Sequence, residues 1–323
     1  MNRKATLHNL ILLIVTIIVV GGFFVASRKI DNENKGESYR QPDYIYNDEY
    51  YIKKDNIRLV LFVGLDSYDS EVEETYRNND LADALVLLVL NQNNKTILPI
   101  QISRDTMCNY HTLGIGGKYI GDEYGQIALA HSYGTGGLDS LVNEKDAVSD
   151  LLTGIRIDDY LSLTMNAIPI INDDCGGIEV FVEDDFSNVD DSLIMGETNL
   201  LMGEHALTFI RSRMGLADPS NINRMNRQRV YLKALYNKCK DLVKQDNDFI
   251  AKTFNDISAY LVASTDIYGL SDLGNLILSY DVLDSVKLES KQEIGEDGYV
   301  QDILDEEAKI DFCLNTFYNK MEH

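Results

Sequence analysis

A single uninterrupted apolar stretch near the N-terminus constrains this chain more than any other feature. Residues 10–27 read LILLIVTIIVVGGFFVAS and contain no charged side chain. A helix rising about 1.5 Å per residue crosses the roughly 30 Å apolar core of a bilayer with a segment of this length. Arg3 and Lys4 precede the stretch, which favours a cytoplasmic N-terminus, although Arg28 and Lys29 follow it and weaken that preference. We therefore expect one transmembrane helix, with the body of the chain outside the cytoplasm.

A cleaved signal peptide is the alternative interpretation of this stretch. No A-x-A cleavage motif closes the apolar run, and no later stretch is long and apolar enough to cross a membrane again. We expect an uncleaved anchor over residues 1–29 and a single-pass protein of the cell membrane. Residues 30–56 are polar and rich in tyrosine, and they are predicted to be a stalk or an ordered edge segment that packs its tyrosines on the body.

The charge of the chain excludes one class of function. It carries 52 acidic against 29 basic residues, a formal net charge of -23. Nonspecific affinity for nucleic acid comes from lysines and arginines that neutralise phosphates, so such a surface repels DNA and RNA. We expect no nucleic-acid partner.

The four cysteines form no motif. Cys108, Cys175, Cys239 and Cys313 are scattered, without a CxxC pair and without histidines at zinc-finger spacing. We interpret them as small buried apolar residues. A disulfide remains possible outside the cytoplasm, but the sequence cannot pair the four residues.

The rest of the chain alternates strand and helix patterns. Apolar runs bounded by turn residues predict strands over 58–63, 84–90, 96–102, 160–165 and 178–182, and helical patterns cover 138–152, 168–173, 204–210 and 223–244. This alternation predicts an α/β/α layered domain around a mixed central β-sheet, over residues 57–245. Residues 246–323 are predicted to be an acidic, mostly helical extension, packed on the domain or separate from it.

Arginines are concentrated in one short segment. Five of the 12 arginines of the chain fall between residues 211 and 229, where chance would put fewer than one: Arg211, Arg213, Arg224, Arg227 and Arg229. Arginine's planar fork suits a bidentate grip on phosphate oxygens. The segment therefore predicts an anion site, although pairing with surface carboxylates would explain the same arginines.

Two carboxylates occupy the ends of predicted strands. Asp66 follows the first strand and Asp83 precedes the second. If these strands are antiparallel neighbours, the two side chains lie at one edge of the sheet, where Mg²⁺ could bind them together with substrate phosphates. Arg104 follows the third strand and would add a guanidinium to the same edge. The alternative is that each aspartate is only a turn or cap residue.

Several short motifs now resemble one known family. From residue 57 to about residue 240 the chain is similar to the LytR-CpsA-Psr proteins of Gram-positive bacteria. Seven matches occur in order: residues 64–67 (GLDS), 82–84 (ADA), 102–106 (ISRDT), 133–137 (YGTGG), 154–160 (GIRIDDY), 175–178 (CGGI) and 201–207 (LMGEHAL), the last running into 211–213 (RSR) and then 224–228 (RMNRQ).

The resemblance implies a specific activity. Members of the family are understood to transfer a glycan phosphate from an undecaprenyl-pyrophosphate-linked anionic polymer, such as wall teichoic acid or capsule, to peptidoglycan, with Mg²⁺ assisting. By position, the resemblance implies Asp66 and Asp83 as Mg²⁺ ligands; Arg104, Arg211, Arg213 and Arg227 with Gln228 as pyrophosphate ligands; and Asp105, Asp218 and Arg224 in supporting roles. Asp83, Asp105 and Arg104 are the expected catalytic residues, and either aspartate could accept the proton of the attacking hydroxyl.

The chain departs from the family pattern at two places. Leu81 stands where the family usually has a pyrophosphate-binding arginine, and Gln126-Ile127-Ala128 stands where Lys-Ile-Asn is common. Two alternatives therefore stay open. The protein could hydrolyse the pyrophosphate with water as acceptor, or it could bind a polyprenyl phosphate without turnover as a regulatory member of the family.

Overall fold

The computed structural model describes residues 41–66, 78, 80–212, 214–217, 221–246, 248–296 and 298–321. The predicted membrane segment and the first part of the predicted stalk lie outside these residues. Within the described ranges, no helix combines the length and the apolar character that a membrane crossing requires.

A seven-stranded mixed sheet forms the centre of the fold, in the order β11-β8-β3-β4-β5-β12, with β13 also beside β5. Its strands are β3 (Ile57–Asp66), β4 (Leu81–Asn91), β5 (Thr96–Ile102), β8 (Asp159–Thr164), β11 (Leu261–Ala263), β12 (Asp281–Val282) and β13 (Val286–Lys287). β3, β4 and β5 are antiparallel neighbours, whereas β8 runs parallel to β3 and both β12 and β13 run parallel to β5.

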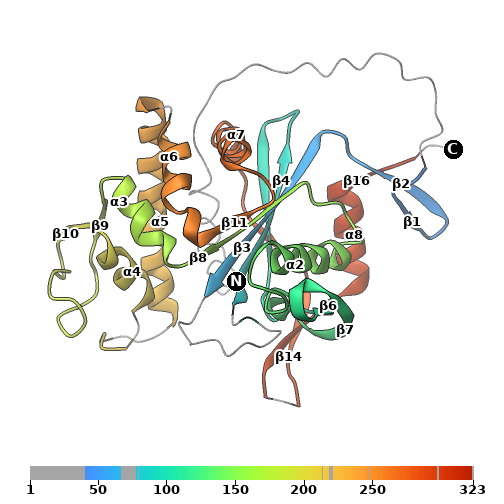
Figure 1. Ribbon diagram of the computed structural model, residues 1–323, viewed down its shortest axis with the longest axis horizontal. Helices are drawn as coiled ribbons and strands as arrows, with labels where there is room; N and C mark the ends of the chain where they lie inside the picture. The colour runs from blue at the N-terminus through green and yellow to red at the C-terminus, as the bar shows by residue number, and fades with distance from the viewer. Residues whose placement is uncertain are drawn as a thin grey trace.

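Both faces of the sheet are buried. Successive residues of β3 and β4 point to opposite faces, and they are apolar on both. Val60 and Phe62 contact one core, and Leu59 and Leu61 contact the other. The first core packs against α3 (Ala167–Asp174), α4 (Glu204–Arg211), α5 (Asn221–Gln245), α6 (Phe249–Asp256) and α7 (Ile267–Leu278). The second packs against α2 (Leu138–Leu151), α8 (Glu306–Phe317) and the hairpin of β6 (Met107–Leu113) and β7 (Tyr119–Gln126). Figure 1 shows the two groups of helices on opposite sides of the central strands.

The predicted mixed α/β fold is therefore confirmed. The predicted strands and helices between residues 57 and 245 are all present, with ends that move by a few residues. The hairpin of β9 (Ile178–Phe181) and β10 (Thr198–Leu201) is a separate two-stranded sheet on the α3–α5 side.

The segment after residue 245 contains strands that its sequence pattern did not predict. β11, β12 and β13 are strands of the central sheet, and β14 (Ser290–Ile294) pairs with β15 (Val300–Leu304) as a hairpin that projects from the body in Figure 1. These strands are two to five residues long, too short to show a period-two pattern. The segment packs on the same fold as the preceding residues and supplies part of both layers.

Part of the predicted stalk is also ordered. β1 (Tyr44–Tyr46) and β2 (Glu49–Lys53) form a hairpin, and β16 (Tyr318–Lys320) adds a third strand to it. The ring of Tyr44 lies 5.8 Å from that of Tyr318. For these residues, the structure agrees with the alternative of an edge segment that packs its tyrosines on the body.

Candidate functional site

The end of β3 and the start of β4 meet at one edge of the sheet, as the carboxylate argument requires. The two strands are antiparallel, and Asp66 is paired with Leu81 across the ladder. The register shifts between Gly64 and Leu65, which leaves Asp83 as an extra residue on β4. A bulge of this kind re-aims the side chain of the extra residue. The backbone of Asp83 therefore lies opposite Gly64 and Leu65, close to the end of β3, while the side chain of Asp66 lies outside the described part of the chain.

Arg104 lies between two aspartates at this edge. It belongs to a tight turn after β5, closed by the Thr106 N–H donating to Ser103 O at 3.0 Å. Its Nη1 forms an ion pair with Asp83, and its Nε lies 3.7 Å from Asp105 Oδ1. The side chains of Arg104, Asp83 and Asp105 are 35%, 33% and 28% exposed. One guanidinium thus touches both carboxylates while about a third of its surface faces solvent.

Asp105 is held by residues that sequence reasoning did not assign to the site. Gln126 Nε2 donates to Asp105 Oδ1 at 3.0 Å and to Val300 O at 2.7 Å, so it ties the aspartate to the β14–β15 hairpin. The Asp302 N–H donates to Asp105 O at 2.8 Å. Burial raises the pKa of Asp105 against the opposing effect of Arg104, and the Asp302 carboxylate adds to the rise. The only sequence signal here was the departure of Gln126 from the family pattern.

A second network anchors the chain just before β4 begins. Asn78 Nδ2 donates to His131 O at 2.9 Å and to Ser140 Oγ at 3.0 Å. His131 Nδ1 lies 3.2 Å from Asp80 O, and its backbone N–H donates to Glu144 Oε2 at 2.8 Å. Burial raises the pKa of Glu144 well above the ordinary value, against the opposing effect of the His131 N–H. These hydrogen bonds attach Asn78 and Asp80, which lie just before β4 and Asp83, to α2 and to His131. No sequence motif indicated this network.

Arg227 lies in a closed set of contacts between α4 and α5. Its Nε donates to Phe209 O at 2.9 Å, its Nη1 pairs with Asp184, and its Nη2 donates to Ser212 O. Its guanidinium carbon lies 5.4 Å from the centre of the Phe186 ring, and the side chain is only 5% exposed. The structure gives Arg227 a structural role; its role in pyrophosphate binding stays a prediction.

Two of the remaining predicted pyrophosphate ligands, Gln228 and Arg211, lie in the described part of these two helices. Gln228 Nε2 donates to Ile210 O at 3.1 Å and is buried. Arg211 is the last residue of α4 and is exposed. Arg213, Asp218 and the side chain of Arg224 lie outside the described part of the chain. Of the predicted site residues, the structure brings Asp83, Arg104 and Asp105 together, and it turns Arg227 and Gln228 toward carbonyl groups of the α4 segment.

Mg²⁺ fits the donor set at the edge of the sheet by its chemistry. Mg²⁺ is commonly held by one or two carboxylates together with substrate phosphates. Asp83 offers a half-exposed carboxylate from β4, and Asp66 ends the adjacent strand. Among the described side chains, no group of three or more histidines, cysteines or carboxylates is arranged to hold a metal by itself. A site here would need the substrate to complete it.

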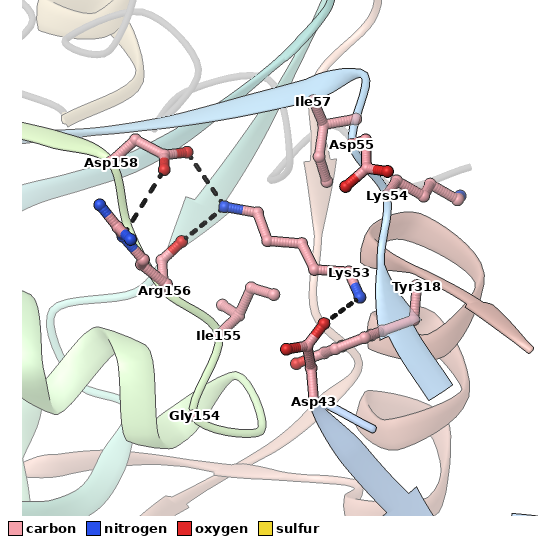
Figure 2. Close-up of a pocket in the computed structure, with 10 residues that line it drawn as sticks. All are labelled: Asp43, Lys53, Lys54, Asp55, Ile57, Gly154, Ile155, Arg156, Asp158 and Tyr318. Carbon is pink, nitrogen blue, oxygen red and sulfur yellow. Dashed lines mark hydrogen bonds and ion pairs between the residues drawn. The ribbon is translucent and has the colours of Figure 1, made fainter. Parts of the chain in front are cut away.

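The cavity of about 410 Å³ in Figure 2 lies at the opposite end of the sheet, where β3 begins. Lys53 crosses it, with Nζ 3.0 Å from Arg156 O and 3.0 Å from Asp158 Oδ2. Tyr318 of β16 lines its other side. The polar groups of this cavity are therefore largely used in contacts with one another, and none of the predicted site residues lines it.

A lipid tail would need an apolar slot between the sheet and its helices, and five apolar residues of these layers could be considered as its lining. Phe62, Ile168, Ile171 and Phe209 belong to the core on the α3–α7 side, whereas Ile100 belongs to the core on the opposite face. All five are buried. Their burial makes them core residues, and the five do not share one slot, because the sheet separates Ile100 from the other four.

Comparison with known proteins identifies the family of the chain. The sequence profile of the LytR_cpsA_psr family matches residues 22–309, most of the chain. The chain belongs to the LytR-CpsA-Psr family. The predicted resemblance is thereby confirmed.

Two relatives of this LytR-CpsA-Psr protein carry the names of transferases. A protein of Bacillus cereus called polyisoprenyl-teichoic acid–peptidoglycan teichoic acid transferase TagU is 27% identical over 236 residues, which cover 71% of this chain and 69% of the relative. The corresponding TagV of Bacillus subtilis is 29% identical over 187 residues, which cover 55% of this chain but only 43% of the relative. The chain thus spans about two thirds of one relative and less than half of the other.

A solved structure shows the same fold. The structure described as TagT bound to LI-WTA aligns with 81% of this chain and 90% of its own, with a TM-score of 0.54 and 20% sequence identity. At 20% identity this structural similarity shows the fold of the chain and says nothing about its substrate.

Proposed function

We propose that this protein is a membrane-anchored, extracytoplasmic phosphotransferase. It would transfer a glycan phosphate from a polyprenyl-pyrophosphate-linked anionic polymer, such as a teichoic acid, to peptidoglycan. Two facts support this proposal: the family membership, with relatives named as teichoic acid transferases, and the cluster of Asp83, Arg104 and Asp105 at one edge of the sheet. The proposed phosphoryl transfer rests on this cluster, because it is where the structure brings predicted catalytic residues into contact.

Phosphoryl transfer depends mainly on positioning and on neutralising charge over the transferred oxygens. Arg104 is suited to this task because its guanidinium is already oriented by two carboxylates and remains a third exposed. It would donate to the oxygens of the pyrophosphate. Asp66 and Asp83 would hold Mg²⁺, which when bound would neutralise the same oxygens. Arg211, Arg213 and Arg224 are proposed to contact the diphosphate from the α4–α5 side, with Asp218 in support. Arg227 and Gln228 would contribute by holding the end of α4 in place.

Asp105 is the preferred proton acceptor. Its pKa is raised by burial, which makes its carboxylate a stronger base than an exposed aspartate. Gln126 holds one of its oxygens, so the orientation of the carboxyl group is fixed before an acceptor arrives. In this proposal Asp105 accepts the proton of the attacking hydroxyl, and Asp83 holds the metal.

One observation favours a second candidate function. Leu81 opens β4 directly opposite Asp66, so the position where the family usually carries an arginine is at the proposed site and offers no charge here. A protein that binds a polyprenyl pyrophosphate without transferring its glycan would tolerate this loss. The candidates differ in turnover, which a direct assay measures.

The test uses the purified full-length chain in detergent, a polyprenyl-pyrophosphate donor with a labelled glycan, Mg²⁺ and peptidoglycan. Transfer predicts label on the peptidoglycan and an equal amount of released polyprenyl phosphate. Label released into solution would instead identify a pyrophosphatase, and binding without either product would identify a binding protein. Arg58→Ala is the matched control for Arg104→Ala, because Arg58 forms an Arg–Asp pair at the opposite end of the same sheet.

The proposed location has its own test. Protease added to intact protoplasts should digest the body of the chain and leave the short N-terminal segment protected. Protection of the whole body until the membrane is lysed would contradict the extracytoplasmic location.

A further inference from the structure

Two cysteines that are far apart in the sequence are in contact in the fold. The Sγ atoms of Cys175 and Cys239 are 3.4 Å apart, although 64 residues separate them. Each side chain is only 2% exposed. Both are thiols in the structure, and one donates a weak hydrogen bond to the other. Cys175 directly follows α3, and Cys239 lies in the second half of α5.

The surrounding contacts hold the two thiols together. Beside them, Tyr231 Oη donates to Asn172 Oδ1 at 3.1 Å, which links α5 to α3, and Asn172 Nδ2 donates to Leu201 O at 2.8 Å. After Cys175 the chain turns through Gly177 with φ +85°, where a Cβ would lie 2.9 Å from Leu201 O. The turn is therefore fixed by a required glycine and by buried hydrogen bonds on both sides. Thiols placed in this way need only a small movement to reach bonding distance.

We propose that Cys175 and Cys239 are a disulfide-forming site that joins α3 to α5 when the chain folds in an oxidising compartment. In the cell this rests on the extracytoplasmic location proposed above. The bond forms by exchange with a disulfide donor such as oxidised glutathione. One cysteine thiolate attacks the donor and expels a glutathione thiolate, and the second attacks the mixed disulfide and expels the other. Two electrons and two protons pass from the cysteines to two molecules of glutathione.

The other two cysteines are not candidates for this bond. Cys108 and Cys313 lie in the core on the opposite face of the sheet from Cys175 and Cys239. The sheet therefore keeps both of them from reaching Cys175 or Cys239 in the native arrangement. They provide an internal control within the same chain.

Timing follows from the same burial. The thiol of Cys239 has a pKa well above its ordinary value, because of its contact with Cys175 and its burial. In the folded, reduced protein both residues are also buried, so an oxidant in solution has little access to their sulfur atoms. The bond is expected to form during folding, before α3 and α5 close over the pair, and then to persist.

The consequence concerns the α5 helix. α5 also carries Arg227 and Gln228, whose side chains hold the end of α4. A covalent link to α3 would fix the second half of α5 while these contacts fix the first half. Closing a loop of this length in the unfolded chain would raise the melting temperature by about 5–10 °C.

The test is refolding of the full chain from a reduced, unfolded state in a glutathione redox buffer. Free thiols are then alkylated under denaturing conditions and the peptides are mapped. We expect a cross-linked peptide pair containing Cys175 and Cys239, with Cys108 and Cys313 alkylated. Alkylation of all four cysteines, or a mixture of pairings, would overturn the proposal. The readout does not use activity, so it is independent of the assay for transfer.

Two variants sharpen the result. The double variant Cys108→Ser with Cys313→Ser should still form the bond and show the higher melting temperature in oxidised form than in reduced form. Cys239→Ser should leave Cys175 alkylated and should lose the difference between the two forms. A melting difference that survives in Cys239→Ser would mean that another pair is responsible.

Discussion

The two ends of the central sheet each carry an arginine–aspartate pair, and the pairs differ in kind. Where β3 begins, Arg58 donates twice to Asp159, from Nε at 2.6 Å and from Nη2 at 2.9 Å. Where β3 ends, Arg104 forms an ion pair with one oxygen of Asp83. Both arginines are 35% exposed, but the Asp159 side chain is 11% exposed and that of Asp83 is 33% exposed.

This difference separates a structural pair from a candidate catalytic one. Each oxygen of Asp159 accepts from the same guanidinium, so the two groups of this pair are oriented toward one another. Arg104 divides its donors between two carboxylates, and Asp83 keeps much of its surface in solvent. Arginine exposure alone would have ranked the two ends equally. The carboxylate geometry distinguishes them.

The largest expected effect tests whether Arg227, like Arg58, stabilises the fold and does not bind the donor. Arg227→Ala leaves Asp184 without its buried partner and removes donors from two carbonyls, so we expect a loss of about 3 kcal/mol in the free energy of unfolding. Urea denaturation measures it. Donor binding by the fraction that remains folded should be nearly unchanged. A stable variant that no longer binds donor would place Arg227 in the phosphate site instead.

An effect of comparable size is expected at the open end of the sheet, and it should appear in the transfer rate. Arg104→Ala or Asp83→Asn should lower the transfer rate by about 100- to 1,000-fold, because each removes a group that positions or neutralises the pyrophosphate. The free energy of unfolding should change by less than about 1 kcal/mol, since the pair is partly exposed and screened by solvent. Full activity in both variants would remove the cluster from the mechanism.

The matched change at the closed end should have the opposite profile. Arg58→Ala is expected to cost about 1–2 kcal/mol of unfolding free energy, reduced from the value of a buried pair by its partial exposure. Its transfer rate per folded molecule should equal that of the unmodified chain. A large loss of rate in Arg58→Ala would abolish the distinction between the two ends.

The smallest effect concerns pH. Because the folded pKa of Asp105 is raised, the folded state disfavours its carboxylate, and this group makes its full favourable contribution below its unfolded pKa. That contribution is lost as the pH rises through the folded pKa. The transfer rate should instead fall as the pH drops through the same range, because protonated Asp105 cannot accept a proton.

Asp302→Asn is the variant that tests this assignment. Removing the neighbouring negative charge should move the acidic limb of the rate profile to lower pH, by less than about one unit. Asp105→Asn should abolish transfer and remove the limb. A limb that stays in place in Asp302→Asn would show that another group controls the profile.

Much of the fold could be predicted from the sequence, because long apolar runs report buried strands directly. The runs that became β3, β4 and β5 were recognised, and the adjacency of Asp66 and Asp83 followed from assuming that their strands were antiparallel. The strands after residue 245 were missed because β12 and β13 have two residues each, and their position is decided by packing against β5.

The candidate site was less predictable. The cluster of arginines suggested a clamp, but spacing along a helix does not tell which side chain points inward, and Arg227 uses its donors on Asp184 and two carbonyls. The contacts of Asp105 with Gln126 and Asp302 join segments that are distant in the sequence, so no local pattern could indicate them. For the same reason, the sequence could not predict that Cys175 and Cys239 are in contact, since 64 residues separate them.

The pairing of β16 with β2 has a mechanical consequence. β2 lies near the N-terminal side of the body, so any load carried by a tether there would act on the hydrogen bonds between residues 51–53 and 318–320. Deleting residues 318–320 would remove β16, and β2 would then keep only its pairing with β1. The strength of attachment at one end of the body would then depend on a few residues that are translated 265 to 269 positions later.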